Sequence, residues 1–263
     1  MHILDANLSC YSTPLGLGGD FPGLHGILCR VTNNSIPSGL YATFPLLVLA
    51  ASASATTIKP FLFCIFNHMK DKGTENIYDR DREFVRENFE ANPLPVGEYE
   101  GCSFDQCNFA HSNLSDCKFI DCRFTGCNLS LTKLNMTAFR EVQFKDCKML
   151  GMRFDQCNAF GLSFSFEQCQ LNHSAFTNTK IRKTHFSNCQ LQEADFTGCD
   201  LTQVILEDCD LTRATFEGSI LEKTDFTTAN NYSIDPERNK LKGAKFSRDG
   251  VAGLLDNYDI RIV

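Results

Sequence analysis

Large apolar residues recur at every fifth position along most of the chain. In the stretch CNFAHSNLSDCKFIDCRFTGCNLS, residues 107–130, Phe or Leu stands two positions after each regularly spaced Cys or Ser. Neither the helical period of 3.6 nor the strand period of 2 produces this spacing. From Phe104 to Phe164 the pattern holds over thirteen consecutive five-residue units. The chain therefore contains a short internal repeat, which predicts a repetitive architecture.

The repeat extends in both directions, with one change of phase. Backward from Phe104 the same phase continues to Phe84, so we expect the repeat to begin near Arg82. After Phe164 the next central residue is Leu171, seven positions later, which predicts a two-residue slip within 165–168. Twelve further units run from Leu171 to Phe226. The segment 230–240 then interrupts the pattern, which resumes at 241 without a net slip.

A five-residue unit cannot bury its own apolar side chain, so stacked units must supply the core. We expect the central residue to fill the interior and the residue two positions earlier to point inward where space is small. Eleven of the fourteen cysteines occupy this small position. The phenylalanines predicted to form the core are Phe104, Phe109, Phe119, Phe124, Phe139, Phe144, Phe154, Phe176, Phe186, Phe196, Phe216 and Phe226.

The units resemble the consensus A(D/N)LXX of the pentapeptide-repeat family. The closest matches are ADFTG (194–198), CDLTQ (199–203), CDLTR (209–213) and CNLSL (127–131). The resemblance implies an all-β fold, a right-handed quadrilateral β-helix over about 82–248. In that fold each unit forms one side of a square, and four units form one coil of twenty residues. The coil length implies a ladder of stacked cysteines, Cys107, Cys127, Cys147, Cys169, Cys189 and Cys209, if the two-residue slip is absorbed in one corner.

Three other segments complete the predicted organisation. Residues 1–68 share nothing with the repeat, and we expect them to be an over-extended start or poorly ordered, with 69–81 as a lead-in. The apolar run within 40–67 leaves membrane anchoring or export as the alternative, although it is short for a membrane span. Residues 249–263 are expected to cap the last coil with a helical turn and a short strand, YDIRIV (258–263). The tail resembles in position the tail-to-tail dimer element of the Qnr and MfpA quinolone-resistance members, so a monomeric cap and a homodimer both stay open.

The cysteine spacing also invites two other interpretations. Pairs with four intervening residues, such as Cys117 and Cys122, have a spacing seen in zinc sites. The members of each pair would lie on different sides of a square coil, and Ser or Thr replaces them in other units. Disulfides are likewise disfavoured if the protein is cytoplasmic, because the cytosol is reducing. We expect neither a metal nor another cofactor.

The second half of the repeat is acidic. The chain has a formal net charge of −7, and the segment 193–225 contains nine acids against two basic residues. An acidic rod can imitate duplex DNA, and the resemblance to Qnr and MfpA makes DNA gyrase or topoisomerase IV the leading partner, with quinolone protection as the result. Direct nucleic-acid binding is not expected. The candidate partner-binding surface is Glu193, Asp195, Asp200, Glu207, Asp208, Asp210, Glu217, Glu222 and Asp225.

A general protein-interaction scaffold is the alternative function. Five apolar residues occupy positions expected to face outward, and they would mark a docking patch if they cluster. These residues are Ile120, Leu131, Met136, Leu150 and Phe160. The inward positions are small or apolar, the six histidines are scattered, and no nucleophile, phosphate-loop or dinucleotide motif occurs. We therefore expect a cytoplasmic binding protein without catalytic activity, and a membrane partner is not expected.

Overall fold

The computed structural model describes residues 9–11, 28–30, 77–258 and 260, and the chain divides into two compact units, 1–73 and 74–263. In the first unit, β1 (Ser9–Tyr11) and β2 (Leu28–Arg30) form an antiparallel pair. The expectations for the rest of 1–68, including the apolar run within 40–67, lie outside the described residues. No helix of the described residues is long and apolar enough to cross a membrane.

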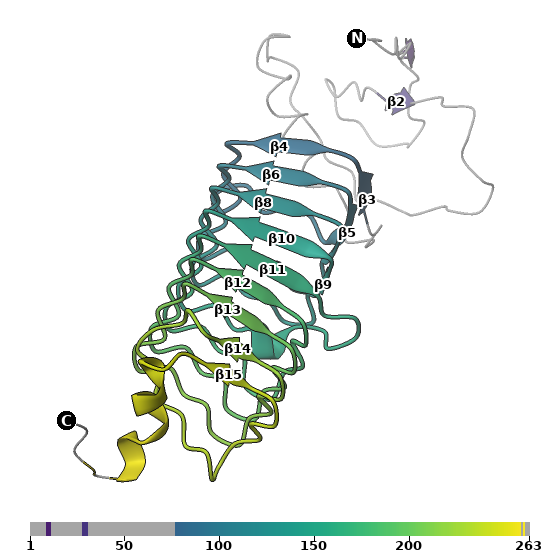
Figure 1. The fold of residues 1–263 in the computed structure, drawn as a ribbon. Coiled ribbons are helices and arrows are strands. Elements are labelled where there is room, and N and C mark those ends of the chain that lie inside the picture. The colour runs from purple at the N-terminus through teal and green to yellow at the C-terminus, as the bar shows by residue number, and fades with distance from the viewer. Residues whose placement is uncertain (1–8, 12–27, 31–76, 259, 261–263) are drawn as a thin grey trace, which may run out of the picture. The chain divides into compact units, whose positions relative to one another are not determined.

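The second unit is a stack of square coils with four faces, seen from the side in Figure 1. We number the faces in chain order by the central residue of one coil: face 1 by Phe104, face 2 by Phe109, face 3 by Leu114 and face 4 by Phe119. Face 1 is a nine-stranded parallel sheet. Its strands are β4 (Glu83–Val85), β6 (Ser103–Asp105), β8 (Arg123–Thr125), β10 (Val142–Lys145), β11 (Phe164–Glu167), β12 (His185–Ser187), β13 (Ile205–Glu207), β14 (Asp225–Phe226) and β15 (Lys245–Phe246).

Face 4 contains a shorter parallel sheet of four strands, and faces 2 and 3 are joined by isolated parallel bridges. Nearly all neighbouring coils pair residues twenty apart, as in Phe119 with Phe139 and Asn108 with Asn128. This register confirms the predicted quadrilateral β-helix, with five residues per side. The strands of face 4 are β3 (Ile77–Arg80), β5 (Gly97–Glu100), β7 (Lys118–Ile120) and β9 (Ala138–Arg140).

The core is a column of stacked central side chains. The twelve phenylalanines assigned to it are all at most 4% exposed. On face 1, for example, the ring of Phe124 stacks on Phe104 and Phe144 with centroid distances of 4.6 and 5.1 Å. Rings on adjacent faces meet edge to face, as Phe119 and Phe124 do. Both arrangements suit the aromatic quadrupole, so the ring contacts stabilise the column beyond the contribution of its buried apolar area.

Most units carry a hydrogen-bond donor at the small inward position. Thr132 Oγ1 donates to the carbonyl of Phe109 at 2.7 Å, and Cys127 Sγ donates to the carbonyl of Phe104 at 3.3 Å. In both cases the acceptor is the central residue 23 positions earlier, in the preceding coil. The Phe109 carbonyl also accepts from Ser112 N at 3.0 Å, so the hydroxyl adds a second hydrogen bond to it. Cysteine, serine and threonine interchange here because each is small and can donate, whereas Val142, Ala194 and Val204 fill the same position without a donor.

The two extra residues lie earlier than the sequence pattern predicted. Phe166, not Phe164, continues the stack on face 1, and Ala159, predicted to be a central residue, is exposed. The insertion is a bulge on face 4 at 159–163, where Ser163 N donates to the carbonyl of Phe139. Leu162 packs against the core in place of Ala159. The pattern misplaced the insertion because both Phe164 and Phe166 are apolar and buried.

Both ends of the coil stack differ in detail from the prediction. The first coil side is β3, which starts five residues before Arg82 and has Asp79 opposite Tyr99, so no apolar central residue marks it in the sequence. At the other end two short 3-10 helices, η2 (Gly250–Leu254) and η3 (Asp256–Tyr258), follow the last coil. Leu254 packs against the core and closes it. Tyr258 belongs to η3 and not to a strand, and of the rest of YDIRIV only Ile260 is described, without strand structure. A further 3-10 turn, η1 (Phe154–Gln156), precedes the bulge.

Candidate interaction surfaces

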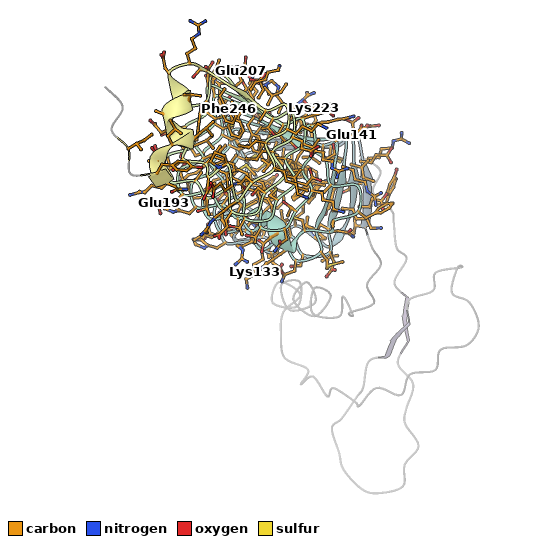
Figure 2. All side chains as sticks on the ribbon, turned by 60° about the horizontal axis from the view of Figure 1, so that its bottom comes forward. Lys133, Glu141, Glu193, Glu207, Lys223 and Phe246 are labelled. Carbon is orange, nitrogen blue, oxygen red and sulfur yellow. The ribbon has the colours of Figure 1, made fainter. Side chains whose placement is uncertain are left out.

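The nine acids of the candidate surface are distributed over all four faces. Glu207 and Asp225 lie on face 1, and Asp210 lies on face 2. Asp195 and Glu217 belong to face 3, and Asp200 and Glu222 to face 4. Figure 2 shows Glu193 and Glu207 on different sides of the coil stack. The structure therefore does not bring these carboxylates together on one side, because residues five apart in this fold occupy adjacent sides of a square.

Four of the nine acids stabilise the coil itself. They stand directly before a central residue, and each accepts a hydrogen bond from the backbone N–H two positions later. For example, Asp210 Oδ1 accepts from Thr212 N at 3.1 Å and from Thr212 Oγ1 at 2.6 Å. Such side-chain turns are what short Asp and Asn side chains form readily. The same contact occurs at Asp195, Asp200 and Asp225, and with an amide oxygen at Asn108, Asn113 and Asn128.

These contacts hold the aspartates in their charged form. Burial by itself would raise the pKa of Asp210, but hydrogen bonds from Asn231, Thr212 and Gln192 outweigh it and lower that pKa to about 2. Asp200 is only 4% exposed. Its burial is likewise outweighed by hydrogen bonds from Arg182, at 2.7 Å, and from Thr202, so its pKa is lowered. The D/N of the repeat consensus thus has a structural role, and these carboxylates are poorly available to a partner.

Most of the other acids have partners within the coil stack. Glu193 pairs with Arg213 and with His173, and Glu217 pairs with Arg238 at 2.7 Å. Glu207 accepts from Ser187 Oγ at 3.0 Å and lies 3.1 Å from His185 Nε2. Only Asp208 and Glu222 have side chains without a hydrogen bond or ion pair among the described residues.

The apolar candidates do not form one group. Ile120 and Arg140 are register neighbours on face 4, and the guanidinium of Arg140 lies 5.5 Å from the ring centroid of Phe160 in the bulge. We call Ile120 and Phe160, which is 77% exposed, the apolar cluster. Met136 is 57% exposed but stands at the opposite end of the side, at the corner with face 3. Leu131 and Leu150 lie apart from it, at and beside the corner between faces 2 and 3, so the five residues do not make one patch.

Sequence reasoning missed a basic strip on the same face. Five exposed lysines lie on face 4 or at its corner with face 1, below the bulge, and we call them the lysine strip: Lys180, Lys183, Lys223, Lys240 and Lys242. Lys180 and Lys240 share one row, and Lys183 and Lys223 share the corner row at φ of 61° and 57°. Their spacings of 40 and 60 residues are multiples of the twenty-residue coil. This spacing could have revealed the lysine strip from the sequence, but acidic residues lie between these lysines in the sequence and obscured it.

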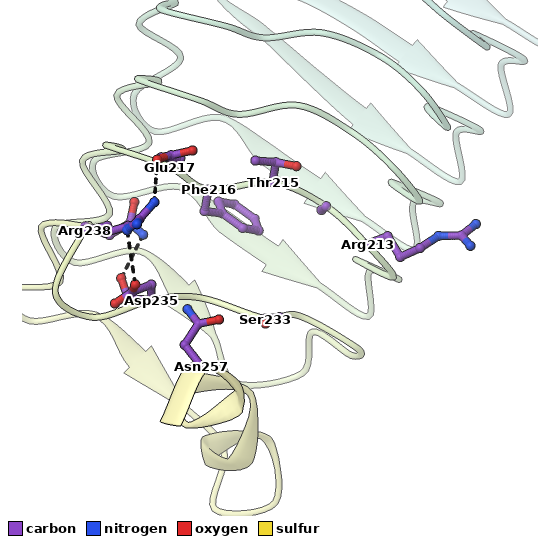
Figure 3. A pocket seen from close by; sticks show the side chains of 10 residues that line it. Arg213, Thr215, Phe216, Glu217, Ser233, Asp235, Arg238 and Asn257 are labelled. Atoms are coloured by element: carbon purple, nitrogen blue, oxygen red, sulfur yellow. Dashed lines mark hydrogen bonds and ion pairs between the residues drawn. The ribbon is translucent and has the colours of Figure 1, made fainter. Parts of the chain in front are cut away.

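A polar groove lies at the C-terminal end of the stack. It has a volume of about 550 Å³, and Figure 3 shows Arg238 between Glu217 and Asp235, with Asn257 of η3 nearby. Arg238 pairs with both carboxylates, at 2.7 and 3.5 Å. The guanidinium of Arg213 points away from the groove, toward its partner Glu193. The charged groups of the groove therefore neutralise one another, and the groove by itself indicates no ligand class.

The coil geometry and the side-chain chemistry together define a class of protein: a parallel β-solenoid with a filled interior and regular rows of outward side chains. The model of the pentapeptide repeat region matches residues 98–165 and 152–226. The chain belongs to the pentapeptide-repeat family. No curated protein matches it.

Solved structures of similar fold come from proteins of low sequence identity. QnrB1, a plasmid-mediated fluoroquinolone resistance protein, is 16% identical with a TM-score of 0.48, over 72% of this chain and 98% of that one. HetL, a protein involved in heterocyst differentiation regulation in the cyanobacterium Nostoc sp. strain PCC 7120, is 14% identical with a TM-score of 0.45, over 70% and 92%. At such identities the likeness concerns the fold alone.

Proposed function

We propose that this protein is a non-catalytic scaffold that binds other proteins through the outer side chains of its coils. The observation that carries the proposal is the contrast between interior and surface. The interior is filled by stacked rings and by donors that satisfy backbone carbonyls. The outside offers an apolar cluster and unpaired lysines on one face. A repeat fold of this kind suits binding because it presents side chains in rigid rows.

The scaffold proposal is tested by binding with one face altered at a time. The full chain is immobilised, and proteins retained from a lysate of the source organism are quantified by mass spectrometry. Four variants each carry two charge or size changes on a single face, with folding checked by circular dichroism. A partner that is retained by three variants and lost by one supports the proposal. Retention that is equal for all variants and for heat-denatured bait contradicts it.

DNA mimicry toward DNA gyrase or topoisomerase IV is the second candidate function. The observation in its favour is that Asp208 and Glu222 project from the coils without a partner, in a segment of high acid content. Two features weigh against it: the nine acids are divided among four faces, and four of them serve the turns. Fewer free carboxylates lie on any one side than an imitation of a phosphate backbone requires.

The discriminating measurement for this second candidate is supercoiling by purified gyrase, with and without ciprofloxacin, over a titration of the full chain. DNA mimicry predicts inhibition or protection that weakens in an Asp208→Asn, Glu222→Gln double variant. The scaffold proposal predicts no effect at micromolar protein.

A homodimer through the C-terminal end also stays a proposal. Val251, Tyr258 and Ile260 are each about half exposed at that end. Such side chains suit a contact between two tails. Sedimentation equilibrium of the full chain and of a Val251→Glu, Tyr258→Glu variant tests it, since only a tail-to-tail dimer would dissociate in the variant.

A further inference from the structure

Face 4 changes its chemical character along the coil stack. Above the bulge, in the coils of β3 to β9, its outward and corner positions carry more acids than bases. Below the bulge, the same positions carry six bases and only two acids, Asp200 and Glu222. Asp200 is buried and is already paired with Arg182. The lower half of face 4 therefore has a net positive charge, on a chain whose overall charge is negative.

The lysine strip has no internal partner. Among the described residues, lysine ion pairs are formed by Lys118, Lys145 and Lys245, and none of the five strip lysines forms one. All five side chains are exposed. Unpaired like charges on one face repel each other and cost stability unless a partner neutralises them. This contrasts with the acids of the same coils, most of which are paired.

The apolar cluster lies at one end of the lysine strip. The bulge that carries Phe160 interrupts the ladder of face 4, and no backbone hydrogen bond of the described residues joins 159–163 to 179–183. The next coil below begins the strip with Lys180 and Lys183. An exposed aromatic ring held by a cation–π contact is a pre-formed anchor of the kind that dominates protein interfaces.

We propose that face 4 binds an extended acidic protein segment that places an apolar side chain against Phe160 and its carboxylates along the lysine strip. This inference rests on the scaffold function proposed above and names the partner class and the face. From the coil of the bulge to that of Lys242 there are four coil spacings, about 19 Å. An extended chain covers that distance with about six residues. The partner is therefore a short linear motif with its anchor at one end.

The surroundings of the strip favour a narrow partner over a broad polyanion. Asp195 and Glu217 lie on face 3, and Glu207 and Asp225 on face 1, so carboxylates flank the strip on both sides, although Glu217 and Asp225 are paired with Arg238 and Lys245. The Debye length is about 8 Å at physiological salt, so a duplex or a bilayer wider than one face would meet these charges. A single extended peptide contacts face 4 alone. The apolar cluster has no counterpart in a phosphate backbone, which also favours a protein segment.

The test uses the full chain and a fluorescein-labelled nine-residue peptide, with Leu-Phe at one end followed by seven acidic residues, in fluorescence anisotropy. We expect Lys183→Glu with Lys223→Glu to weaken binding at least tenfold. Phe160→Ala should weaken it about three- to tenfold, and should leave the binding of a second peptide, with Ser-Ser in place of Leu-Phe, unchanged. The matched control is Lys133→Glu with Lys148→Glu, which makes the same charge change on faces 3 and 2 and should alter binding less than twofold.

Three results would overturn the inference: no binding of the peptide at millimolar concentration, an equal loss in the matched control, or tighter binding of the strip to oligo-dT or to phosphatidylserine vesicles than to the peptide. The lysate experiment with one face altered at a time distinguishes failure of the face 4 inference from failure of the scaffold proposal. If a protein is captured and then lost only when faces 1, 2 or 3 are altered, the scaffold proposal holds and the assignment of face 4 is wrong.

Discussion

Phe144 and Phe166 stack with their ring centroids 5.3 Å apart and their planes 11° apart, although they are 22 residues apart in sequence. The other stacked phenylalanine pairs of face 1 are twenty apart, as are Phe124 and Phe144. The core column therefore continues without a step across the insertion. The two additional residues are accommodated on face 4 instead, where they project Phe160 into solvent. One local change thus leaves the stability of the core intact and creates a surface feature.

Replacing Phe124 by Asp should unfold the coils around it. Phe124 is fully buried between the rings of Phe104 and Phe144, so the carboxylate would be buried without a partner. We expect the free energy of unfolding to fall by more than about 4 kcal/mol, measured by urea denaturation. The control is Phe124→Leu, since Leu206 occupies the equivalent place in another coil, and it should cost about 1–2 kcal/mol. Equal midpoints for the parent and the Asp variant would show that the side chain does not face inward.

At the small inward position, the hydrogen bond from the side-chain hydroxyl should contribute more to stability than the volume of the side chain. Thr137 is fully buried and donates to the carbonyl of Leu114 at 2.8 Å. Thr137→Val preserves the shape but leaves this carbonyl without that donor, so we expect a loss of about 1–2 kcal/mol in chemical denaturation. Thr137→Ser retains the donor and should cost less than Val. If Val and Ser prove equally stable, the hydrogen bond is not the reason for the residue preference.

Stability should fall in acid as the turn aspartates protonate. The pKa of Asp210 is lowered to about 2 from 3.8, so its contribution is fully present above pH 4 and is lost as pH falls toward 2. Asp195, Asp200 and Asp225 have lowered pKa values too, and their contributions are lost in the same direction. Urea denaturation from pH 6 to pH 2 measures the summed contribution of these four aspartates to the free energy of unfolding.

The matched variant for this pH dependence is Asp210→Asn. An amide oxygen makes the same turn contact elsewhere, as Asn128 does with Ser130 N at 3.2 Å. We expect the variant to lose about 1 kcal/mol at pH 6, because the charge-assisted part of the contacts is gone, and to depend less on pH below 4. If the variant loses as much stability in acid as the parent does, Asp210 does not contribute to the pH dependence.

The thiols of the coil stack should be unreactive in the folded protein. Burial raises the pKa of Cys122 to about 12 and that of Cys107 to about 11, so little thiolate forms at neutral pH. With Cys10, Cys29 and Cys64 replaced by Ser, we expect Ellman's reagent at pH 8 to label the folded chain slowly and all eleven remaining cysteines after unfolding in guanidinium. Cys157 is the only one of the eleven that is not fully buried, so it should react first. Rapid labelling of several thiols in the folded state would contradict the packed ladder.

The period of five predicted a stacked repeat and the identity of its core, and the resemblance to the pentapeptide-repeat family implied the square coil. Whether a side chain such as Phe124 or Cys127 points inward depends on its position within one unit, which is a local property of the chain. The predicted cysteine ladder follows from counting in twenties, with the two-residue slip placed between Cys147 and Cys169. The bulge was misplaced because Phe164 and Phe166 are equally apolar, and a one-dimensional pattern does not show which of them stacks on Phe144.

The repeat pattern and its family resemblance predict a square solenoid, the residues that fill it and a surface rich in acids. Which charges share a face, and which are already paired as Asp200 is with Arg182, becomes clear from the stacked coils. The physical reason lies in the length scales of the fold. Burial repeats every five residues, whereas neighbours on a face are about twenty residues apart and their phase shifts with every insertion. The lysine strip and the apolar cluster beside it therefore become visible only once the coils are stacked.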